Sequence, residues 1–380
     1  MIFIFWLCIA AVFYAYFGYP LILWLITRFI SNKQALPHTT KLPSVSLIIS
    51  AYNEEDVIHE KILNSLSLDY PKELLEIIVV SDGSTDHTNE IAIKYSNEGV
   101  ILQVYEGRIG KTACLNQAVP KCNGDIIVFS DANSKYDVNC IKNLVREFAH
   151  PYVGLVTGTT KYIKKDANII SESVGIYTAF ENFTKKLESR IGSCVGADGA
   201  IFAIRKPLYQ DLKDYDINDF VIPLNVIRQS YRVVFTEKAF CIEGTAQDST
   251  KEFNRQIRIT NRTIRAIFNN IDMLNPIKFY FFSIEFFSHK LLKFLVPVSL
   301  FFILVINLLL LTQGIVYNIF FAVQASCYFL AILGRSQESL RESSRLISII
   351  YTFVSVNIAI FLGWITYFKG ETYTTWKIMR

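Results

Sequence analysis

Three short runs rich in valine and isoleucine each end in side chains or backbone that could contact a ligand. The residues at these ends are Ala51, Asn53, Glu54, Asp82, Asp131 and Asn133. In open parallel sheets, ligands bind beside the carboxyl ends of the strands. If the three runs are strands of one such sheet, these residues are placed to contact a bound nucleotide.

The segment that follows the second run combines groups suited to this task. Asp82 can accept hydrogen bonds from a base or a ribose, and Gly83 permits close approach of the backbone. Turn formation and capping of a following helix by Ser84–Asp86 would account for this segment equally well. The same alternative applies to the end of the first run, and only the two segments together favour a nucleotide site.

The elements that must position these groups alternate along residues 43–270. Short apolar runs bounded by turn residues predict strands at Val45–Ser50, Glu76–Ser81, Val100–Tyr105, Asp125–Ser130 and Gly154–Gly158. Segments of helical period lie between them, at Asp56–Leu68, Asp86–Tyr95 and Lys111–Val119. This alternation predicts an α/β domain whose mostly parallel sheet is covered on both faces.

The first 30 residues predict a transmembrane helix. Ile2–Ile26 carries no charge, and a helix needs about 20 apolar residues to cross a bilayer. The segment has neither the basic start nor the small-residue cleavage site of a signal peptide. Arg28, Lys33 and Lys41 follow it, so the positive-inside rule places the next domain in the cytosol.

The chain becomes apolar again after residue 270. Residues 276–290 predict a helix in the membrane interface, and residues 291–380 predict a transmembrane region. Its candidate spans are Phe294–Leu311, Ile315–Leu333 and Leu346–Phe368. Arginines in the loop Gly334–Arg345 favour the cytosolic side for that loop.

The last apolar segment has two interpretations. A full crossing would put Lys369, Lys377 and Arg380 outside, against the charge rule. A re-entrant or broken segment would keep them inside, and the sequence does not decide between the two.

Composition agrees with an integral membrane protein and argues against several other classes. Hydrophobic residues make up 51% of the chain and charged residues 19%. The net charge of +4 includes no run of lysine and arginine, which argues against nucleic acid as a partner. The seven cysteines have no metal-binding spacing, so we expect free thiols in a reducing cytosol. The five histidines adjoin no nucleophile motif, and a Ser-His-Asp hydrolase is not supported.

Together, these segments resemble a known family. Val45–Asp86 is similar to the opening of family 2 glycosyltransferases, which have the GT-A fold. Gly107–Asn116 is similar to the family's loop in which a lysine, here Lys111, lies near the donor. The resemblance covers residues 43 to about 265 and continues in looser form through the apolar tail. It implies a Rossmann-like nucleotide-sugar domain, inverting transfer and a membrane-anchored bacterial polysaccharide or glycolipid enzyme.

The resemblance also implies a divalent metal, magnesium or manganese. Asp131-Ala132-Asn133 is similar by position to the family's D-x-D motif, which holds the ribose and a metal that bridges the two phosphates. A hard cation with oxygen ligands would neutralise the departing nucleoside diphosphate. Asn133 replaces the second carboxylate and can ligate a metal, but it contributes no charge. The alternative is an ordinary turn at the end of a strand.

Two later segments resemble the acceptor side of the family. Gly196–Lys206 is similar to the glycine-rich acceptor strand, and it implies acceptor contacts at Asp198 and Gly199. Small residues there would let the backbone pack against a sugar ring. By itself this signal is weak, because glycine pairs mark many bends.

The segment Asn218–Phe220 opens a predicted helix and matches the family's E-D motif. The resemblance makes Asp219 the general base for the acceptor hydroxyl. One alternative is a carboxylate that only stabilises the helix by meeting its dipole, an effect of ~0.3–1 kcal/mol. The nearby Asp216 is the other candidate for the base.

A basic helix closes the domain. Arg255 and Arg258 lie three residues apart on one helical face and could bind the diphosphate of the donor. Their spacing is similar to the Q-x-x-R-W motif of processive synthases, with Ile259 at the Trp position. The alternative for such a helix is contact with anionic head groups, which we expect of Arg262 and Arg265, whereas we assign Arg258 to the diphosphate.

We therefore expect a multi-pass inner-membrane enzyme that transfers a sugar, from UDP in our interpretation, to a lipid-linked or saccharide acceptor. One rival is a processive polysaccharide synthase with an export pore, which four candidate spans and the missing tryptophan disfavour. The other rival is a membrane scaffold with a degenerate transferase domain. Only Asn133 supports that rival.

Overall fold

The chain forms two compact units that interleave along the sequence. The computed structural model describes residues 1–30, 41–163, 169–244 and 249–374, so Lys33, Lys377 and Arg380 lie outside the described residues. Unit 1 takes in residues 1–29, 164–184 and 246–371, and unit 2 takes in residues 30–163, 185–245 and 372–380. The sequence predicted a continuous domain over residues 43–270. The units divide that range because α9 (Ser249–Asn269) packs along α15 (Arg345–Phe368) within unit 1.

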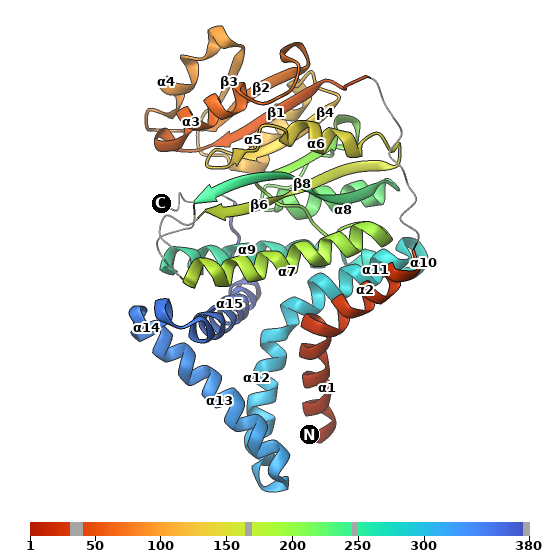
Figure 1. The fold of residues 1–380 in the computed structure, drawn as a ribbon, viewed down its shortest axis with the longest axis vertical. Coiled ribbons are helices and arrows are strands. Elements are labelled where there is room, and N and C mark those ends of the chain that lie inside the picture. Colours follow the sequence, from red (N-terminus) through yellow and green to blue (C-terminus); the bar gives the residue numbers. More distant parts are fainter. Residues whose placement is uncertain (31–40, 164–168, 245–248, 375–380) are drawn as a thin grey trace. The chain divides into compact units, whose positions relative to one another are not determined.

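Unit 2 is built on one eight-stranded mixed sheet (Figure 1). Its strands are β1 (Val45–Ala51), β2 (Leu75–Asp82), β3 (Val100–Tyr105), β4 (Ile126–Asp131), β5 (Lys135–Tyr136), β6 (Val153–Ile163), β7 (Ile201–Arg205) and β8 (Arg232–Gly244). Their order is β3-β2-β1-β4-β7-β6-β8-β5. The first four strands are parallel to one another, and β7 is antiparallel to both of its neighbours. The predicted strands are therefore present, and β6 extends beyond the predicted Gly154–Gly158 because it continues its pairing with β8 after a register shift.

The helices of unit 2 connect these strands. They are α3 (Glu55–Leu66), α4 (Thr88–Ile93), α5 (Lys111–Ala118), α6 (Cys140–Glu147) and α8 (Asn218–Arg228). Every residue of β1 is buried, which explains why the apolar residues Leu47–Ile49 follow one another in this strand instead of alternating with exposed polar ones. None of the seven cysteines, all of which lie among the described residues, forms a disulfide, and the five in unit 2 are buried as small core side chains.

One helix of unit 2 buries a lysine. Lys61 lies on the same face of α3 as Ile58 and Ile62, and it is only 1% exposed. Its ammonium donates a hydrogen bond to the carbonyl oxygen of Ser134 and lies 4.0 Å from the ring centroid of Tyr136. Burial disfavours the charged form and lowers the pKa of Lys61 to about 8.

This burial makes the stability of the fold depend on pH above neutrality. Between the lowered pKa of folded Lys61 and its ordinary value of 10.5, the unfolded chain binds more protons than the folded one, so stability rises with pH. Below pH 8 both states are protonated and the cost of the buried charge is constant. Lys61→Met removes this dependence. Between pH 8 and pH 10, the difference between the free energies of unfolding of the wild type and of Lys61→Met should shift by about 2–3 kcal/mol in favour of the wild type.

Chemical unfolding of both proteins at pH 7, 8, 9 and 10 measures the difference. Lys94→Met is the control, because it removes an exposed charge from the end of α4. A constant difference between wild type and Lys61→Met across this range would contradict the assignment.

Unit 1 contains the apolar helices. They are α1 (Ile2–Phe13), α2 (Tyr19–Phe29), α10 (Pro276–Phe279), α11 (Phe281–Glu285), α12 (Leu292–Leu310), α13 (Ile315–Ser336), α14 (Glu338–Ser343) and α15, beside α9 and the first part of α7 (Ile169–Ile191). Among the described residues, four helical stretches are long and apolar enough to cross a membrane, at Ile2–Phe29, Phe281–Gln313, Ile315–Ser336 and Arg345–Phe368. These stretches correspond to the candidate spans in the sequence.

Two of these stretches bend at π-helical segments. Tyr14–Gly18 separates α1 from α2, and Figure 1 shows α2 turned away from α1. Phe286–Leu291 separates α11 from α12 in the same way. The predicted interfacial helix is consequently three pieces, because the backbone also breaks at Tyr280, where φ is 51°.

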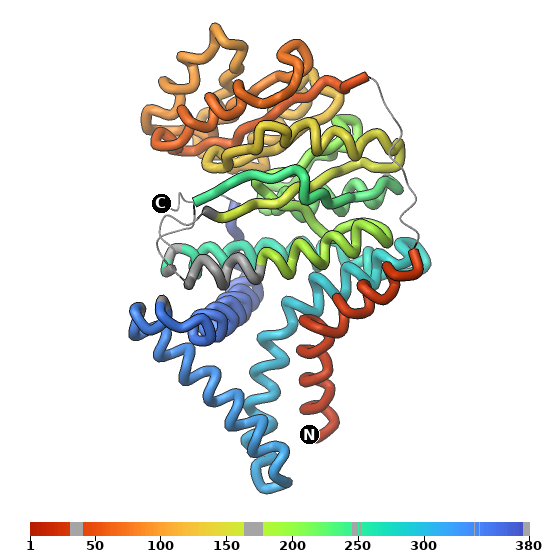
Figure 2. Tube along the Cα trace, viewed as in Figure 1, coloured from red at the N-terminus to blue at the C-terminus, as the bar shows by residue number. Residues whose placement is uncertain are grey.

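The last apolar stretch is neither broken nor aligned with its neighbours. α15 is one continuous helix, so the broken alternative for this segment does not hold. Figures 1 and 2 show α15 nearly end-on, whereas α12 and α13 run lengthwise in the same view. α15 therefore crosses those two helices at a steep angle.

A buried ionic cluster ties these helices together. Glu181 of α7 forms ion pairs with Lys293 of α12 and, at 3.0 Å, with His289 of the second π segment. The side chains of Glu181 and Lys293 are 16% and 11% exposed. The hydroxyl groups of Tyr14 and Ser288 are 2.9 Å apart, which joins the two π segments directly.

Loss of one member of this cluster should destabilise unit 1. Removing one partner of a buried ion pair typically costs about 3–5 kcal/mol, because the other charge stays buried without it. We expect Lys293→Met to lower the thermal unfolding midpoint in detergent clearly, and the double variant Glu181→Gln/Lys293→Met to recover part of the loss. Lys278→Met, at an exposed position, is the control. Equal stability of Lys293→Met and wild type would show that the cluster is not structural.

Candidate functional site

The strand ends singled out in the sequence meet at one edge of the sheet. The register pairs Ala51 with Ser81 and Ser50 with Asp131. Asp82 ends β2 on one side of β1, and Asp131 ends β4 on the other side. The parallel arrangement thus brings Ala51, Asp82 and Asp131 together, as the sequence predicted.

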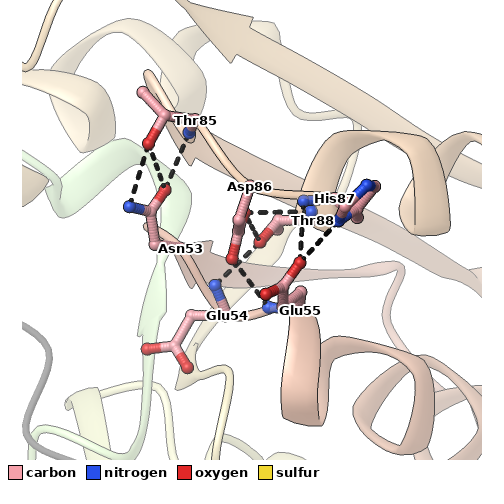
Figure 3. Close-up of polar contacts among 7 residues, drawn as sticks. All are labelled: Asn53, Glu54, Glu55, Thr85, Asp86, His87 and Thr88. Atoms are coloured by element: carbon pink, nitrogen blue, oxygen red, sulfur yellow. Dashed lines mark hydrogen bonds and ion pairs between the residues drawn. The ribbon is translucent and has the colours of Figure 1, made fainter.

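The loops after β1 and β2 are joined by hydrogen bonds (Figure 3). The side-chain oxygen of Asn53 accepts from the Thr85 amide at 2.7 Å, and its Nδ2 donates to the Thr85 hydroxyl at 3.1 Å. The Glu54 amide donates to the Thr88 hydroxyl at 2.7 Å. Asn53 has a positive φ of 51°, which asparagine tolerates better than most residues. Asn53 therefore connects the two loops. The sequence predicted that Asn53 contacts the donor, but it did not predict the bonds to Thr85.

A second set of bonds strengthens this junction. Glu55 accepts from the His87 amide at 3.0 Å and lies 2.8 Å from its ring nitrogen Nδ1. The hydrogen bonds from His87 lower the pKa of the Glu55 carboxyl, and the bond to Glu55 raises the pKa of His87. The Glu55 amide also donates to Asp86 at 3.1 Å. The loops after β1 and β2 are therefore connected by several hydrogen bonds.

Asp82 holds a loop from elsewhere in the sequence. Its carboxylate is 1% exposed and accepts from the amides of Ile109 and Gly110 at 2.8 and 3.0 Å. Bonds from backbone amides offset the cost of burying this charge. Gly83 has a φ of 65°, and a Cβ there would lie 3.2 Å from the backbone of Gly107. The sequence assigned Asp82 to the base or ribose, which stays a prediction, but it did not reveal this bond to the loop.

The same loop leads into Lys111, whose ammonium lies at the end of β4. Lys111, the first residue of α5, forms an ion pair with the carboxylate of Asp131. The side chains are 18% and 38% exposed, so the pair is reachable from solvent. Two residues predicted to bind the donor are thus in contact. Gly110 has a φ of 95°, and a Cβ there would lie 2.6 Å from the carbonyl oxygen of Thr374, a neighbour that the sequence did not predict.

The loop after β4 is held by a hydrogen bond from a buried side chain. Asn133 is exposed, while Ala132 and Ser134 on either side of it are buried. The buried Lys61 binds the Ser134 carbonyl and so fixes the course of this loop. Sequence reasoning missed Lys61, although a lysine on the apolar face of a predicted helix was a usable signal.

The residues present fit a divalent metal only in combination with a donor. The described part of the chain has no group of three or more His, Cys, Asp or Glu side chains that could hold an ion. Asp131 and Asn133 would each supply one hard oxygen, and phosphates and water would complete the ligands, as is usual for magnesium. The bound ammonium of Lys111 shows that Asp131 already attracts a cation at this position.

Asp219 and Gly199 lie against each other. Asp219 is in the first turn of α8, and a Cβ on Gly199 would lie 2.9 Å from its Oδ2. The Ala197 amide donates to the Asp219 carbonyl at 2.8 Å. Only glycine fits at residue 199 without displacing the carboxylate. Two predicted acceptor-side residues are therefore neighbours.

Two other carboxylates serve the fold. Asp198 accepts from the amide and the hydroxyl of Thr160 at 2.8 and 3.0 Å, which ties it to β6. Asp216 is 7% exposed and accepts from the Lys213 amide at 3.0 Å, and its carbonyl accepts from the Thr112 hydroxyl at 3.0 Å. Asp216 thus shapes the turn before α8. The acceptor role predicted for Asp198 stays a prediction.

The arginines of α9 belong to unit 1. Arg255 pairs with Glu252 at 3.3 Å, and contact of Arg255 and Arg258 with a diphosphate stays a prediction. Arg265 donates to the Glu371 carbonyl at 2.9 Å and lies 5.3 Å from the ring centroid of Tyr367. Arg265 therefore contacts the end of α15, and its expected contact with head groups stays a prediction.

Known proteins share this domain. Residues 46–213 match the sequence model of Glycosyl transferase family 2. The chain is 27% identical over 222 residues to a Staphylococcus aureus protein named poly-beta-1,6-N-acetyl-D-glucosamine synthase. That alignment covers 56% of this chain and 53% of the relative, so the chain spans about half the length of the curated relatives it matches.

A solved structure extends the similarity beyond the matched domain. The fold is similar to that of a mannosyltransferase from Pyrobaculum calidifontis in complex with GDP-Man and Mn²⁺, with a TM-score of 0.72 and 20% identity. The match covers 97% of this chain and 99% of the other. This likeness confirms the GT-A fold, and the sequence match shows that residues 46–213 carry a family 2 glycosyltransferase domain.

Proposed function

We propose that this enzyme transfers a sugar from a nucleoside diphosphate sugar to a hydroxyl group, with inversion, at a membrane surface. The observation that carries the proposal is the contact between Lys111 and Asp131 at the carboxyl edge of the sheet. A carboxylate and an ammonium, both accessible to solvent, suit a ligand that carries hydroxyl groups and phosphates. Asp131 would accept from the ribose, and Lys111 would face the phosphates.

The departing diphosphate needs positive charge near it in the transition state. Lys111 supplies one such charge, and it is positioned before the donor arrives because Asp82 fixes the preceding residues Ile109 and Gly110. A divalent metal held by Asp131 and Asn133 would neutralise further charge on the phosphates when bound. Arg258 would add a guanidinium group to the same phosphates.

Asp219 would take the proton from the acceptor hydroxyl. Its Oδ2 lies 2.9 Å from where a Cβ on residue 199 would be, so the absence of a side chain at Gly199 makes space for the carboxylate itself. The alternative base, Asp216, is engaged in the turn before α8 and is nearly inaccessible. Asp219 is therefore better placed to meet an acceptor sugar over Gly199, with Asp198 nearby in the sequence.

The setting of the reaction follows from the apolar helices. We propose that the stretches at Ile2–Phe29, Phe281–Gln313 and Ile315–Ser336 cross the bacterial inner membrane, with the catalytic unit in the cytosol. The named activity of the Staphylococcus aureus relative supports a UDP-linked amino sugar as donor and a polysaccharide or lipid-linked saccharide as acceptor. Ile259 stands at the place of the tryptophan in processive synthases, which favours short products over long chains.

The metal assignment is tested at Asp131 and Asn133. Asp131→Ala should abolish turnover and remove the metal dependence of donor binding, because the variant loses the charged ligand. Asn133→Asp should keep activity and tighten manganese binding in the presence of nucleotide, because it adds a charge. Calorimetry with and without chelator measures donor binding. Full activity of Asp131→Ala in the presence of chelator would exclude this site.

The base assignment is tested at Asp219. Asp219→Asn keeps the size of the side chain but removes the proton acceptor, and loss of a general base typically costs about 10²–10⁴ in rate. Affinity for the donor and the thermal unfolding midpoint should stay near the wild-type values. Asp216→Asn is the matched comparison, and we expect it to affect stability more than turnover. Normal turnover of Asp219→Asn, or loss of folding in parallel with activity, would defeat the assignment.

The whole function is tested by a donor panel. Purified full-length protein in detergent is incubated with UDP-sugars and GDP-sugars, and the release of nucleoside diphosphate is measured with and without saccharide acceptors. Acceptor-dependent release from one donor class supports the transfer, and analysis of product length separates single addition from polymerisation. Nucleotide binding without release from any donor would instead indicate a scaffold.

A further inference from the structure

Unit 1 contains a cavity that no step of the proposed transfer uses. Its volume is about 680 Å³, within the usual range for ligand pockets. The lining comes from α9, α12, α13, α14 and α15. Most of the wall is hydrocarbon, including Leu300, Phe301, Leu304, Ile358 and Phe361.

Two arginines interrupt this apolar wall. Arg335 lies in the last turn of α13 and is exposed, and Arg341 lies on α14 and is only 5% exposed. Both line the cavity. The guanidinium of Arg341 lies 4.8 Å from the ring centroid of Tyr351, which also lines it. Both cations thus belong to the short connection between α13 and α15.

The combination defines the chemistry of a ligand. Hydrocarbon walls favour an aliphatic chain, because its burial removes apolar surface from water. Guanidinium groups bind phosphate oxygens through paired hydrogen bonds, and they are well suited to the task because their donors are fixed in a plane. A free nucleotide or sugar would leave the apolar side chains of the wall in contact with water. A neutral lipid would form no ion pair with the two arginines.

We propose that this cavity binds one anionic glycerophospholipid from the surrounding bilayer. An acyl chain lies between α12 and α15, and the phosphate lies at Arg335 and Arg341. The proposal rests on the membrane setting proposed above. Basic pockets between membrane helices on the cytoplasmic side are suited to such head groups.

Lipid in this cavity would also touch the basic helix of the enzyme. Thr250 and Phe253 of α9 line the cavity together with residues of α12 and α15. Arg255 and Arg258 follow Phe253 by two and five residues in the same helix. A bound lipid would therefore order α9 against the apolar helices and hold these arginines in one position.

The binding experiment uses purified full-length protein in detergent. Fluorescent phosphatidylglycerol and phosphatidylcholine with identical acyl chains are the probes. We expect phosphatidylglycerol to bind at least about tenfold more tightly, and Arg335→Gln/Arg341→Gln to remove this preference. Arg28→Gln/Lys369→Gln removes the same net charge away from the cavity and should leave the preference unchanged. Arg335→Gln alone, at an exposed position, serves if the double variant does not fold.

Two further arms test whether the lipid binds inside the cavity and whether it is a glycerophospholipid. Ala331→Trp places a large side chain in the cavity from α13, and Ser355→Phe does so from α15. Each variant, if it folds, should bind both phospholipids more weakly than the wild type. An isoprenyl monophosphate is the competitor. Equal binding of the two phospholipids, an unchanged preference in the arginine variants, or displacement of phosphatidylglycerol by lower concentrations of the isoprenyl phosphate would overturn the proposal. Carbonate extraction of the wild type from membranes tests the membrane setting separately.

Discussion

Two carboxylates on either side of β1 hold the loop on which the candidate site depends. Asp82 binds the amides of Ile109 and Gly110, and Asp131 binds the ammonium of Lys111 one residue later. The last residues of this loop are therefore held at two strand ends of the carboxyl edge of the sheet, one on each side of β1. Because Asp82 is nearly inaccessible, its bonds are shielded from water and resist displacement. The accessible pair at Asp131 is the part that can exchange partners when a ligand arrives.

The sheet and its polar edge were predictable because their signals are local. A strand buried on both faces is a continuous apolar run, and polar residues directly after it must lie at the sheet edge. The bond between Asp82 and the amide of Gly110 was not predictable in this way. Any exposed loop could supply such an amide, and only the fold selects the one at residue 110. Lys61 was missed for a related reason, because its acceptor is a backbone carbonyl that the sequence does not single out.

In unit 1, composition predicted which segments are apolar helices but not how they run. The π-helical segment Tyr14–Gly18 changes the direction of the first helix just before Pro20, which has no amide hydrogen to donate to the carbonyl four residues earlier. The packing of α15 against α9 depends on one small residue, since a Cβ on Gly363 would lie 2.4 Å from the side chain of Thr260. Asn261 donates to the Thr366 hydroxyl at 3.0 Å beside this contact. A glycine in an apolar helix has many uses, so its role as a contact point becomes visible only with its partner in place.

The neighbour of Gly110 has a consequence for the synthesis of the protein. The backbone carbonyl of Thr374 packs at this glycine, although the apolar helices α12, α13 and α15 lie between the two in the sequence. Domains generally fold from the amino terminus while the ribosome is still translating. The parallel strands β1 to β4 can thus assemble early, but the loop that carries Lys111 gains this last contact only after all the apolar helices have been made. The carboxyl edge of the sheet would therefore be completed only at the end of synthesis, after the apolar helices have been translated.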